Sequence, residues 1–243
     1  MRVIPVPVRS DNYAYLLIDD STKKAAAIDP YDTNKVAEAA EAAGVQLEAV
    51  ITTHHHADHS GGNEEFVKAY PGVAVYGGSY MIPALTREIK DKDEFPFGSI
   101  YECDSICFYV EDKKTGQRGV FTGDTLFMAG CGRFFEGTAT EMHKALLYLG
   151  SLPDDTIVYN GHEYTSSSVA FGAHIDPENA AIKKLQAMAE EEKVTTGKTT
   201  IGDEKQWNVF MRLDTVPVQK ATGLTDPVRV MDKLREMKNS FRS

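Results

Sequence analysis

A run of histidines that directly follows an apolar segment is the feature that most constrains what this chain can fold into. Residues 47–52, Leu-Glu-Ala-Val-Ile-Thr, have the composition of a buried strand, and residues 53–59 read Thr-His-His-His-Ala-Asp-His. Four of the seven histidines therefore stand within six positions. Since alternate residues of an extended segment point the same way, His54 and His56 can converge on one metal ion, and Asp58 and His59 can face a second.

This mixture of imidazole and carboxylate ligands suits zinc, iron or manganese. The competing interpretation is a chance histidine tract or a purification tag. A tag does not explain the embedded aspartate, or the position of the run between a predicted strand and a predicted helix. We therefore predict a metal site at residues 54–59.

Two other apolar segments end in metal-binding residue types. Val-Phe-Thr-Gly at 120–123 leads to Asp124, and Ile-Val-Tyr-Asn-Gly at 157–161 leads to His162. Taken singly, Asp124 could form an Asx-turn or cap a helix, and a lone histidine is more often structural than a ligand. Three strand ends that each deliver such side chains favour one common site.

The periodicity predicts a layered α/β domain followed by a helical one. The predicted strands are 2–8, 13–18, 25–28, 47–52, 73–76, 105–110 and 119–121. The predicted helices are 33–43, closed by Gly44, then 63–70, 139–149, 180–193 and 227–241. We predict domains at 1–168 and 169–243.

Composition and charge narrow the class of protein. The net charge is −10, and residues 1–168 carry 14 Lys and Arg against 25 Asp and Glu, which disfavours nucleic acid as a partner. No apolar run approaches the ~20 residues of a membrane span, and the first residues do not resemble a targeting signal. The three cysteines, an odd and sparse set, suit a reducing compartment. We expect a cytoplasmic monomer without membrane partners.

The last predicted helix concentrates positive charge. Five cations face only Asp232 and Glu236 there, namely Arg229, Lys233, Arg235, Lys238 and Arg242. A solvated helix face is one interpretation, and an anchor for an anionic ligand is the other.

Three motifs in the chain, THHHADH at 53–59, FTGDTLF at 121–127 and GHEYT at 161–165, resemble the metallo-β-lactamase fold superfamily and, within it, the glyoxalase II family, the hydroxyacylglutathione hydrolases. The likeness continues through AGCGRFFEGT at 129–138 and NVFMRL at 208–213. It implies an αββα sandwich followed by a small α-helical C-terminal domain. It also implies hydrolysis of S-D-lactoylglutathione to glutathione and D-lactate by a metal-bound hydroxide, a reaction of methylglyoxal detoxification.

The resemblance further implies roles for particular residues. His54 and His56 would bind the first of two divalent metals, zinc in preference to iron or manganese. Asp58, His59 and His162 would bind the second, and Asp124 would bridge both, so that Asp58 and Asp124 are the catalytic carboxylates. Asp29 is similar to a position that supports the ligands, although a plain turn residue fits equally well.

The resemblance places the glutathione site on cations, because glutathione carries two carboxylates. Arg133, Tyr164, Arg235 and Lys238 match family positions that contact glutathione, and Arg235 and Lys238 are spaced to grip one ligand on a helix. Phe135 departs from the tyrosine of many members, which predicts one hydroxyl contact fewer and weaker substrate binding.

The sequence departs from the family at one metal ligand. A third histidine for the first metal normally lies in a Thr-Pro-x-His-Thr turn, whereas residues 97–105 here read Phe-Gly-Ser-Ile-Tyr-Glu-Cys-Asp-Ser. Glu102, Cys103 or Asp104 could in principle replace it. Two alternatives to the hydrolase therefore stay open: an iron-dependent glutathione persulfide dioxygenase with one metal, and a catalytically impaired protein that binds metal or glutathione.

Overall fold

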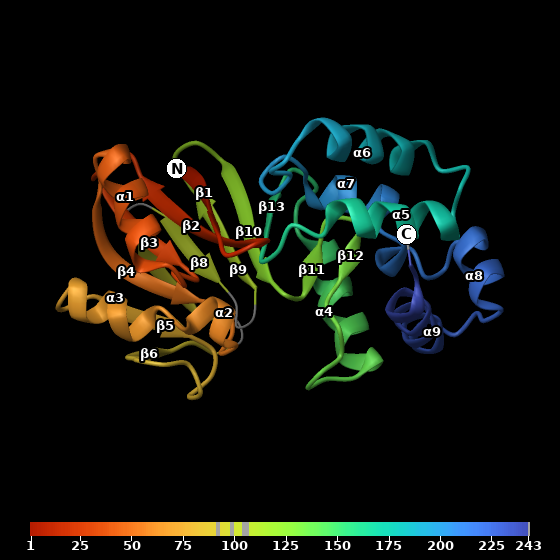
Figure 1. The fold of residues 1–243 in the computed structure, drawn as a ribbon, viewed down its shortest axis with the longest axis horizontal. Helices are drawn as coiled ribbons and strands as arrows, with labels where there is room; N and C mark the ends of the chain where they lie inside the picture. Colours follow the sequence, from red (N-terminus) through yellow and green to blue (C-terminus); the bar gives the residue numbers. More distant parts are fainter. Residues whose placement is uncertain (91–92, 98–99, 104–106, 243) are drawn as a thin grey trace. The chain divides into compact units, whose positions relative to one another are not determined.

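A computed structural model describes residues 1–90, 93–97, 100–103 and 107–242, with only the backbone at 100–103. The chain divides into two compact units, Met1–Gly123 and Asp124–Ser243, which are described separately (Figure 1). This division differs from the predicted boundary between residues 168 and 169, which stays a prediction. In the part of the chain given above, none of the helices combines the length and the apolar character needed to cross a lipid bilayer.

The first sheet of the first unit runs in the order β1-β2-β3-β4-β5-β6. Its strands are β1 (Arg2–Val8), β2 (Asn12–Asp19), β3 (Lys24–Ile28), β4 (Gln46–Thr52), β5 (Ala74–Gly77) and β6 (Arg87–Glu88). Short turns join β1, β2 and β3 into antiparallel pairs. The pairs from β3 onward are parallel, and helices make the crossovers between β3 and β4 and between β4 and β5.

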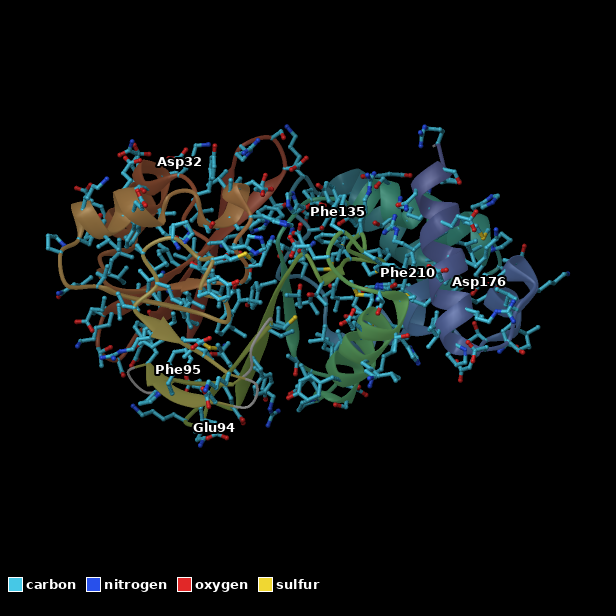
Figure 2. The ribbon with its side chains drawn as sticks, turned by 90° about the horizontal axis from the view of Figure 1, so that it is seen from below. Asp32, Glu94, Phe95, Phe135, Asp176 and Phe210 are labelled. Atoms are coloured by element: carbon cyan, nitrogen blue, oxygen red, sulfur yellow. The ribbon has the colours of Figure 1, made fainter. Side chains whose placement is uncertain are left out.

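Three helices belong to the first unit: α1 (Thr33–Ala43), α2 (Ala57–Ser60) and α3 (Asn63–Ala69). Asp32, labelled in Figure 2, caps α1 by accepting a hydrogen bond from Lys35 N at 3.1 Å, and Gly44 ends the helix with φ 66°. Val36 and Ala40 on α1, and Phe66 on α3, are buried in one cluster with side chains of the first sheet. These two helices therefore cover one face of that sheet.

The second sheet packs on the opposite face. Four of its strands lie in the first unit, in the antiparallel order β10-β9-β8-β7: β7 (Glu94–Phe97), β8 (Ile100–Cys103), β9 (Phe108–Asp112) and β10 (Gln117–Gly123). Every residue of β2 is buried. Leu16 joins the cluster under the helices, and the ring of Tyr15 lies 5.3 Å from that of Phe121 on β10. The first unit is thus layered as helices, sheet and sheet.

The predicted strands of the first sheet are confirmed to within a residue or two, and both predicted helices are found. The hairpin of β7 and β8 was not predicted, because Pro96 and Gly98 suggest a loop there. The strand predicted at 105–110 is described from Phe108 onward as β9, and residues 105 and 106 of that prediction lie outside the described residues.

The second unit is mostly helical. Its helices are α4 (Ala139–Ser151), α5 (Thr165–Ile175), α6 (Ala180–Glu191), α7 (Ile201–Trp207), α8 (Val216–Thr222) and α9 (Pro227–Ser240), with a 3-10 turn at Val209–Met211. Its short strands are β11 (Leu126–Phe127), β12 (Gly130–Cys131) and β13 (Ile157–Asn160). The helices predicted at 139–149, 180–193 and 227–241 are confirmed. α5, α7 and α8 were not predicted, and the start of α5, Thr-Ser-Ser-Ser, has the polar composition of a loop.

A glycine controls the end of β10, just before Asp124. Gly123 has φ 46°, and a Cβ atom there would lie 2.7 Å from Thr53 Oγ1 and 2.9 Å from Thr53 Cβ. Gly116 also has a positive φ, 73°, but a Cβ atom there would meet nothing within 4 Å. Both positions disfavour alanine by their backbone, and only Gly123 adds a clash.

We therefore expect Gly116→Ala to lower the free energy of unfolding by about 1 kcal/mol and Gly123→Ala to lower it by about 3 kcal/mol. Urea unfolding of both variants and the parent measures this difference. Equal losses in the two variants would show that the contact with Thr53 is unimportant.

Candidate metal centre

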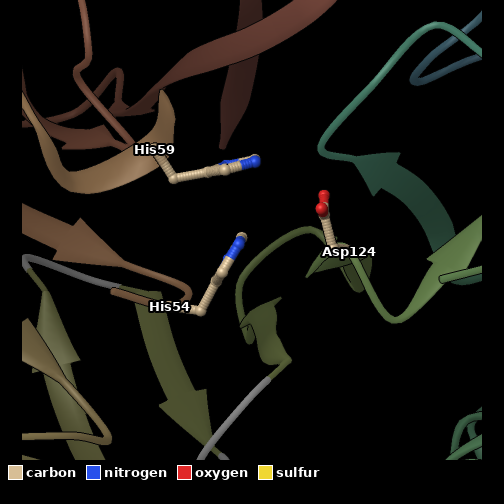
Figure 3. Close-up of side chains that lie close together, drawn as sticks. All are labelled: His54, His59 and Asp124. Carbon is tan, nitrogen blue, oxygen red and sulfur yellow. The ribbon is translucent and has the colours of Figure 1, made fainter. Parts of the chain in front are cut away.

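The histidine run lies where β4, a buried parallel strand, ends and α2 begins. Catalytic and ligand-binding groups of layered α/β folds gather at such strand ends. The ring of His54 lies 4.2 Å from that of His59 and 4.7 Å from that of His56, measured between centroids. Figure 3 shows His54, directly after β4, and His59, on α2. The rings of His54 and His56 are neighbours, but the donor atoms that lie within 4.8 Å of one another pair His54 with His59 and His56 with His55. The convergence of His54 and His56 on one metal ion stays a prediction.

Thr53 and Asp29 determine which nitrogen of His54 can bind a metal. The Thr53 hydroxyl donates its one hydrogen to Asp29 Oδ2 at 2.6 Å, and its oxygen lies 3.0 Å from His54 Nδ1. Since that hydrogen is already committed, Nδ1 must donate to the hydroxyl. His54 Nε2 is then the ring nitrogen with the lone pair that a metal requires.

Asp29 also fixes the ring proton of His59 on Nδ1. His59 Nδ1 lies 2.9 Å from Asp29 Oδ2, and the backbone N–H of Thr53 donates to Asp29 Oδ1 at 2.8 Å. Asp29 is 3% exposed and has φ 47°, a conformation that non-glycine residues rarely adopt. These three contacts favour the supporting role for Asp29 over that of a plain turn residue.

Asp58 is held by a residue that the sequence did not single out. Asn12, at the start of β2 and 3% exposed, donates from Nδ2 to Asp58 Oδ2 at 3.0 Å and to the Asp58 carbonyl at 3.3 Å. The same carboxylate oxygen lies 3.8 Å from His59 Nε2. Asp58 and His59 are therefore arranged to present an oxygen and a nitrogen side by side.

The second unit brings its own two candidate ligands together. His162 follows β13 and Asp124 precedes β11, and His162 Nε2 lies 3.3 Å from Asp124 Oδ1. Asn160 donates to the His162 carbonyl at 2.7 Å, and the ring of Tyr164 stacks on that of His162 at 4.8 Å. Carboxylate and imidazole are thus adjacent in this unit, as metal ligands must be.

The candidate substrate residues Arg133, Arg235 and Lys238 are close enough to influence one another. Burial is the main cause that lowers the pKa of Arg235, and the charge of Arg133 lowers it further. Burial, and then the charge of Arg235, lower the pKa of Lys238 to about 8. Positive charges held together at an energetic cost are typical of a site for an anion.

These cations nevertheless point to different partners. Arg235, 7% exposed, donates from Nη1 to the Cys131 carbonyl at 2.8 Å and from Nε to Asn239. Lys238 Nζ donates to the Ser167 carbonyl. Arg133 and Arg235 line a pocket of about 760 Å³, whereas Lys238 and Tyr164 do not line it. The predicted common grip of Arg235 and Lys238 on one ligand stays a prediction.

The residues suggested as replacements for the missing histidine are not tested. Asp104 and the side chains of Glu102 and Cys103 lie outside the described residues.

The described donors fit divalent metal ions. Hydrogen bonds at Nδ1 of His54 and His59 leave Nε2 for coordination, and carboxylates stand beside an imidazole in both units. This combination of neutral imidazole and carboxylate is the donor set of zinc, iron and manganese sites.

Comparison with known proteins shows the superfamily and the fold of this chain. Residues 11–104 match the metallo-beta-lactamase superfamily, and residues 163–241 match the family described as hydroxyacylglutathione hydrolase C-terminus. The crystal structure of ETHE1 from Myxococcus xanthus superimposes with a TM-score of 0.69 at 22% identity, over 99% of this chain and 91% of that one. The fold is therefore that of the metallo-β-lactamases, as predicted, and together with the candidate His and Asp clusters it implies divalent metals.

Two relatives narrow the class to a family. A probable hydroxyacylglutathione hydrolase of Schizosaccharomyces pombe is 43% identical and covers 98% of both chains. The cytoplasmic hydroxyacylglutathione hydrolase of Arabidopsis thaliana is 38% identical and covers 100% of both. The chain belongs to the hydroxyacylglutathione hydrolases, the glyoxalase II family of thioester hydrolases.

The alignments also bear on the missing histidine. They extend over 256 and 257 positions, more than the 243 residues of this chain. The relatives therefore contain residues that have no counterpart here, and a shortened segment at 97–105 stays a prediction from the sequence.

Asp29 should control metal affinity. Asp29→Asn replaces one acceptor oxygen by an N–H donor among three groups that donate to Asp29, so that the rings of His54 and His59 lose their fixed orientation. We expect zinc to bind about 10- to 100-fold more weakly, as measured by competition with a chromophoric chelator. Asp32→Asn, at the half-buried N-cap of α1, is the control and should bind zinc as the parent does. Equal affinity in both variants would contradict the role of Asp29.

Proposed function

We propose that this chain hydrolyses 2-hydroxyacylglutathione thioesters, with S-D-lactoylglutathione as the substrate and glutathione and D-lactate as the products. The observation that carries the proposal is a pocket lined by the cations Arg133 and Arg235, in the unit in which Asp124 and His162 lie 3.3 Å apart. A glutathione thioester needs cations and metal ligands in one site, because its peptide part is anionic and its thioester must reach the metal centre.

The proposed metal ligands are those predicted from the sequence. His54 and His56 hold the first ion, Asp58, His59 and His162 hold the second, and Asp124 is shared by both. When bound, two divalent ions, zinc in preference to iron or manganese, supply a hydroxide at neutral pH and stabilise negative charge on the thioester oxygen.

The surrounding residues prepare these ligands. Thr53 and Asp29 keep the ring protons on Nδ1 of His54 and His59, so that neither ring has to reorient or give up a proton from Nε2 before it coordinates a metal. Asn12 orients the carboxylate of Asp58 by donating to Oδ2, the oxygen that lies 3.8 Å from His59 Nε2, and this carboxylate coordinates the second ion or helps in proton transfer. The leaving thiolate needs little protonation, since a thiol pKa is about 8.5.

The substrate contacts follow from charge and exposure. Arg133, Arg235 and Lys238 attract the two carboxylates of glutathione, and Tyr164, 38% exposed, offers a hydroxyl and a ring face. Phe135 is 74% exposed and has no hydroxyl to offer. We infer that phenylalanine at position 135, where many family members have tyrosine, weakens substrate binding and leaves the chemical step intact.

The missing histidine should lower the affinity of the first metal site. With one imidazole fewer, this ion binds more weakly than the second, so that activity needs a higher concentration of free metal. The alternatives make different demands: a persulfide dioxygenase binds one iron and consumes oxygen, and an impaired protein binds metal without turnover.

The wider setting of the proposal is methylglyoxal detoxification in the cytoplasm by a monomer. The name of the Arabidopsis relative includes the word cytoplasmic, and few cysteines suit a reducing compartment. The acidic first 168 residues disfavour nucleic acid as a partner.

The direct test follows the thioester absorbance of S-D-lactoylglutathione after the purified chain is saturated with zinc. We expect turnover that falls at least 100-fold in Asp124→Ala and in His54→Ala. His55→Ala is the matched control within the histidine run and should retain turnover. A folded parent chain without turnover above a zinc-only blank would refute the hydrolase, and oxygen uptake with glutathione persulfide would replace it by the dioxygenase.

Lys238 gives the substrate site a characteristic pH dependence. Its pKa of about 8 means that it carries its charge below pH 8 and loses it above. Binding of S-methylglutathione should therefore be steady near pH 7 and weaken as the pH rises through 8 to 9.

Lys238→Met should bind the ligand roughly tenfold more weakly at pH 7 and should lack this step, as titration calorimetry can show. Lys233→Met, which removes an exposed lysine paired with Glu236 on the same helix, is the control. A step that persists in Lys238→Met would assign the titration to another group.

A further inference from the structure

The hairpin of β11 and β12 is a small buried element that depends on other residues for its polar contacts. Its strands pair at Leu126 with Cys131 and at Phe127 with Gly130. Ala129, in the turn between them, is 1% exposed and has φ 56°. Buried amide and carbonyl groups need partners, because water does not reach them.

Glu204 and Asn208, four residues apart at the end of α7, provide these partners. Ala129 N donates to Glu204 Oε2 at 2.9 Å. Asn208 Nδ2 donates to the Gly130 carbonyl at 3.0 Å and to Glu204 Oε2 at 2.9 Å. Trp207 Nε1 donates to Glu204 Oε1 at 2.9 Å. Glu204 and Asn208 are completely buried, so this network is a fixed part of the interior of the second unit.

The hairpin adjoins the site groups of the second unit. Asp124 precedes β11 by two residues, and Arg133 follows β12 by two. The ring of Phe127 meets those of Tyr164 at 5.1 Å and His162 at 6.0 Å, both edge-on. The Cys131 carbonyl accepts the hydrogen bond from Arg235. A shift of the hairpin would therefore move candidate metal ligands and candidate substrate residues together.

Burying a carboxylate to accept three hydrogen bonds costs desolvation free energy. Burial raises the pKa of Glu204 to about 7, although the N–H groups of Trp207, Asn208 and Ala129 each act to lower it. An apolar or amide side chain avoids this cost of desolvation. What the carboxylate adds is two acceptor oxygens in a fixed plane, which hold the hairpin and α7 in one arrangement.

We propose that Glu204 is a positioning residue that sets the hairpin, and through it Asp124, His162 and the cations Arg133 and Arg235, in the geometry needed for metal and glutathione binding. The proposal rests on the function proposed above, since it assigns those residues to the metal and substrate sites. It is tested with zinc and S-methylglutathione as probes, so that turnover is not needed to judge it.

Glu204→Gln is the informative variant. Glutamine keeps the size of the side chain, but its N–H₂ group must face either Trp207 Nε1 or the two donors at Oε2, so that N–H groups meet head-on and the side chain cannot keep its present position. We expect zinc to bind at least tenfold more weakly and S-methylglutathione several-fold more weakly. The fluorescence of Trp207, the one tryptophan of the chain, reports the local change directly.

Two controls separate positioning from stability alone. Asp176→Asn removes a buried ion pair with Arg212 (2.8 Å) in the same unit, away from the hairpin, and should lower the unfolding temperature without changing either affinity. Trp207→Phe removes a donor to Glu204 but leaves the bonds to the hairpin, and should also keep both affinities. Asn208→Ala, which retains the bond from Ala129 to Glu204, provides a second test if Glu204→Gln does not fold, and should weaken both probes.

The outcomes are distinct. Loss of both affinities in Glu204→Gln or Asn208→Ala, with Asp176→Asn unaffected, supports the proposal even when the parent shows no thioester turnover. Parent-like affinities in Glu204→Gln, or equal losses in Asp176→Asn at the same stability, overturn it. A folded parent that binds neither zinc nor S-methylglutathione overturns both this proposal and the proposed function.

Discussion

The carboxylate of Asp29 is the group on which the arrangement of the first unit's site depends. It follows β3, and its own backbone N–H donates to the Ile51 carbonyl of β4 at 3.0 Å, so that the ends of two neighbouring strands are tied together. Its oxygens then receive Thr53, at the end of β4, and His59, on α2. One buried anion thus connects two strand ends and a helix, and it fixes the ring protons of two histidines. The positive φ of Asp29 is tolerated because these contacts hold it.

The sequence predicted those parts of the fold that depend on local signals. α1 is bounded by Asp32 and Gly44, which act on residues four positions away or fewer, and β4 is an apolar run followed by polar residues. The metal-binding residue types were recognised because their kind and spacing carry chemical information. Asn12 and Glu204 were missed for the opposite reason. Their partners lie 46 and 75 positions away, and a single asparagine or glutamate has no local signature of burial.

In the basic helix α9, the spacing of the cations along the sequence does not predict which groups they contact. Arg235 and Lys238 are three positions apart, which places their Cβ atoms on one side of the helix. Their head groups nevertheless reach the Cys131 and Ser167 carbonyls, on different elements. The long aliphatic stems of Arg and Lys are buried, and their charged groups can reach several different acceptors. The direction of the charged group therefore depends on the packing around the helix.

The first strand, β1, has a consequence for the sheet as a whole. It is an edge strand that pairs with β2 along its length, and it contains Pro5 and Pro7. Residues two apart in a strand direct their backbone N–H groups to the same side, and a proline has none to donate. The outer edge of β1 therefore lacks two successive donors that another chain would need for strand addition. At this edge the first sheet therefore resists strand addition through its backbone rather than through surface charge.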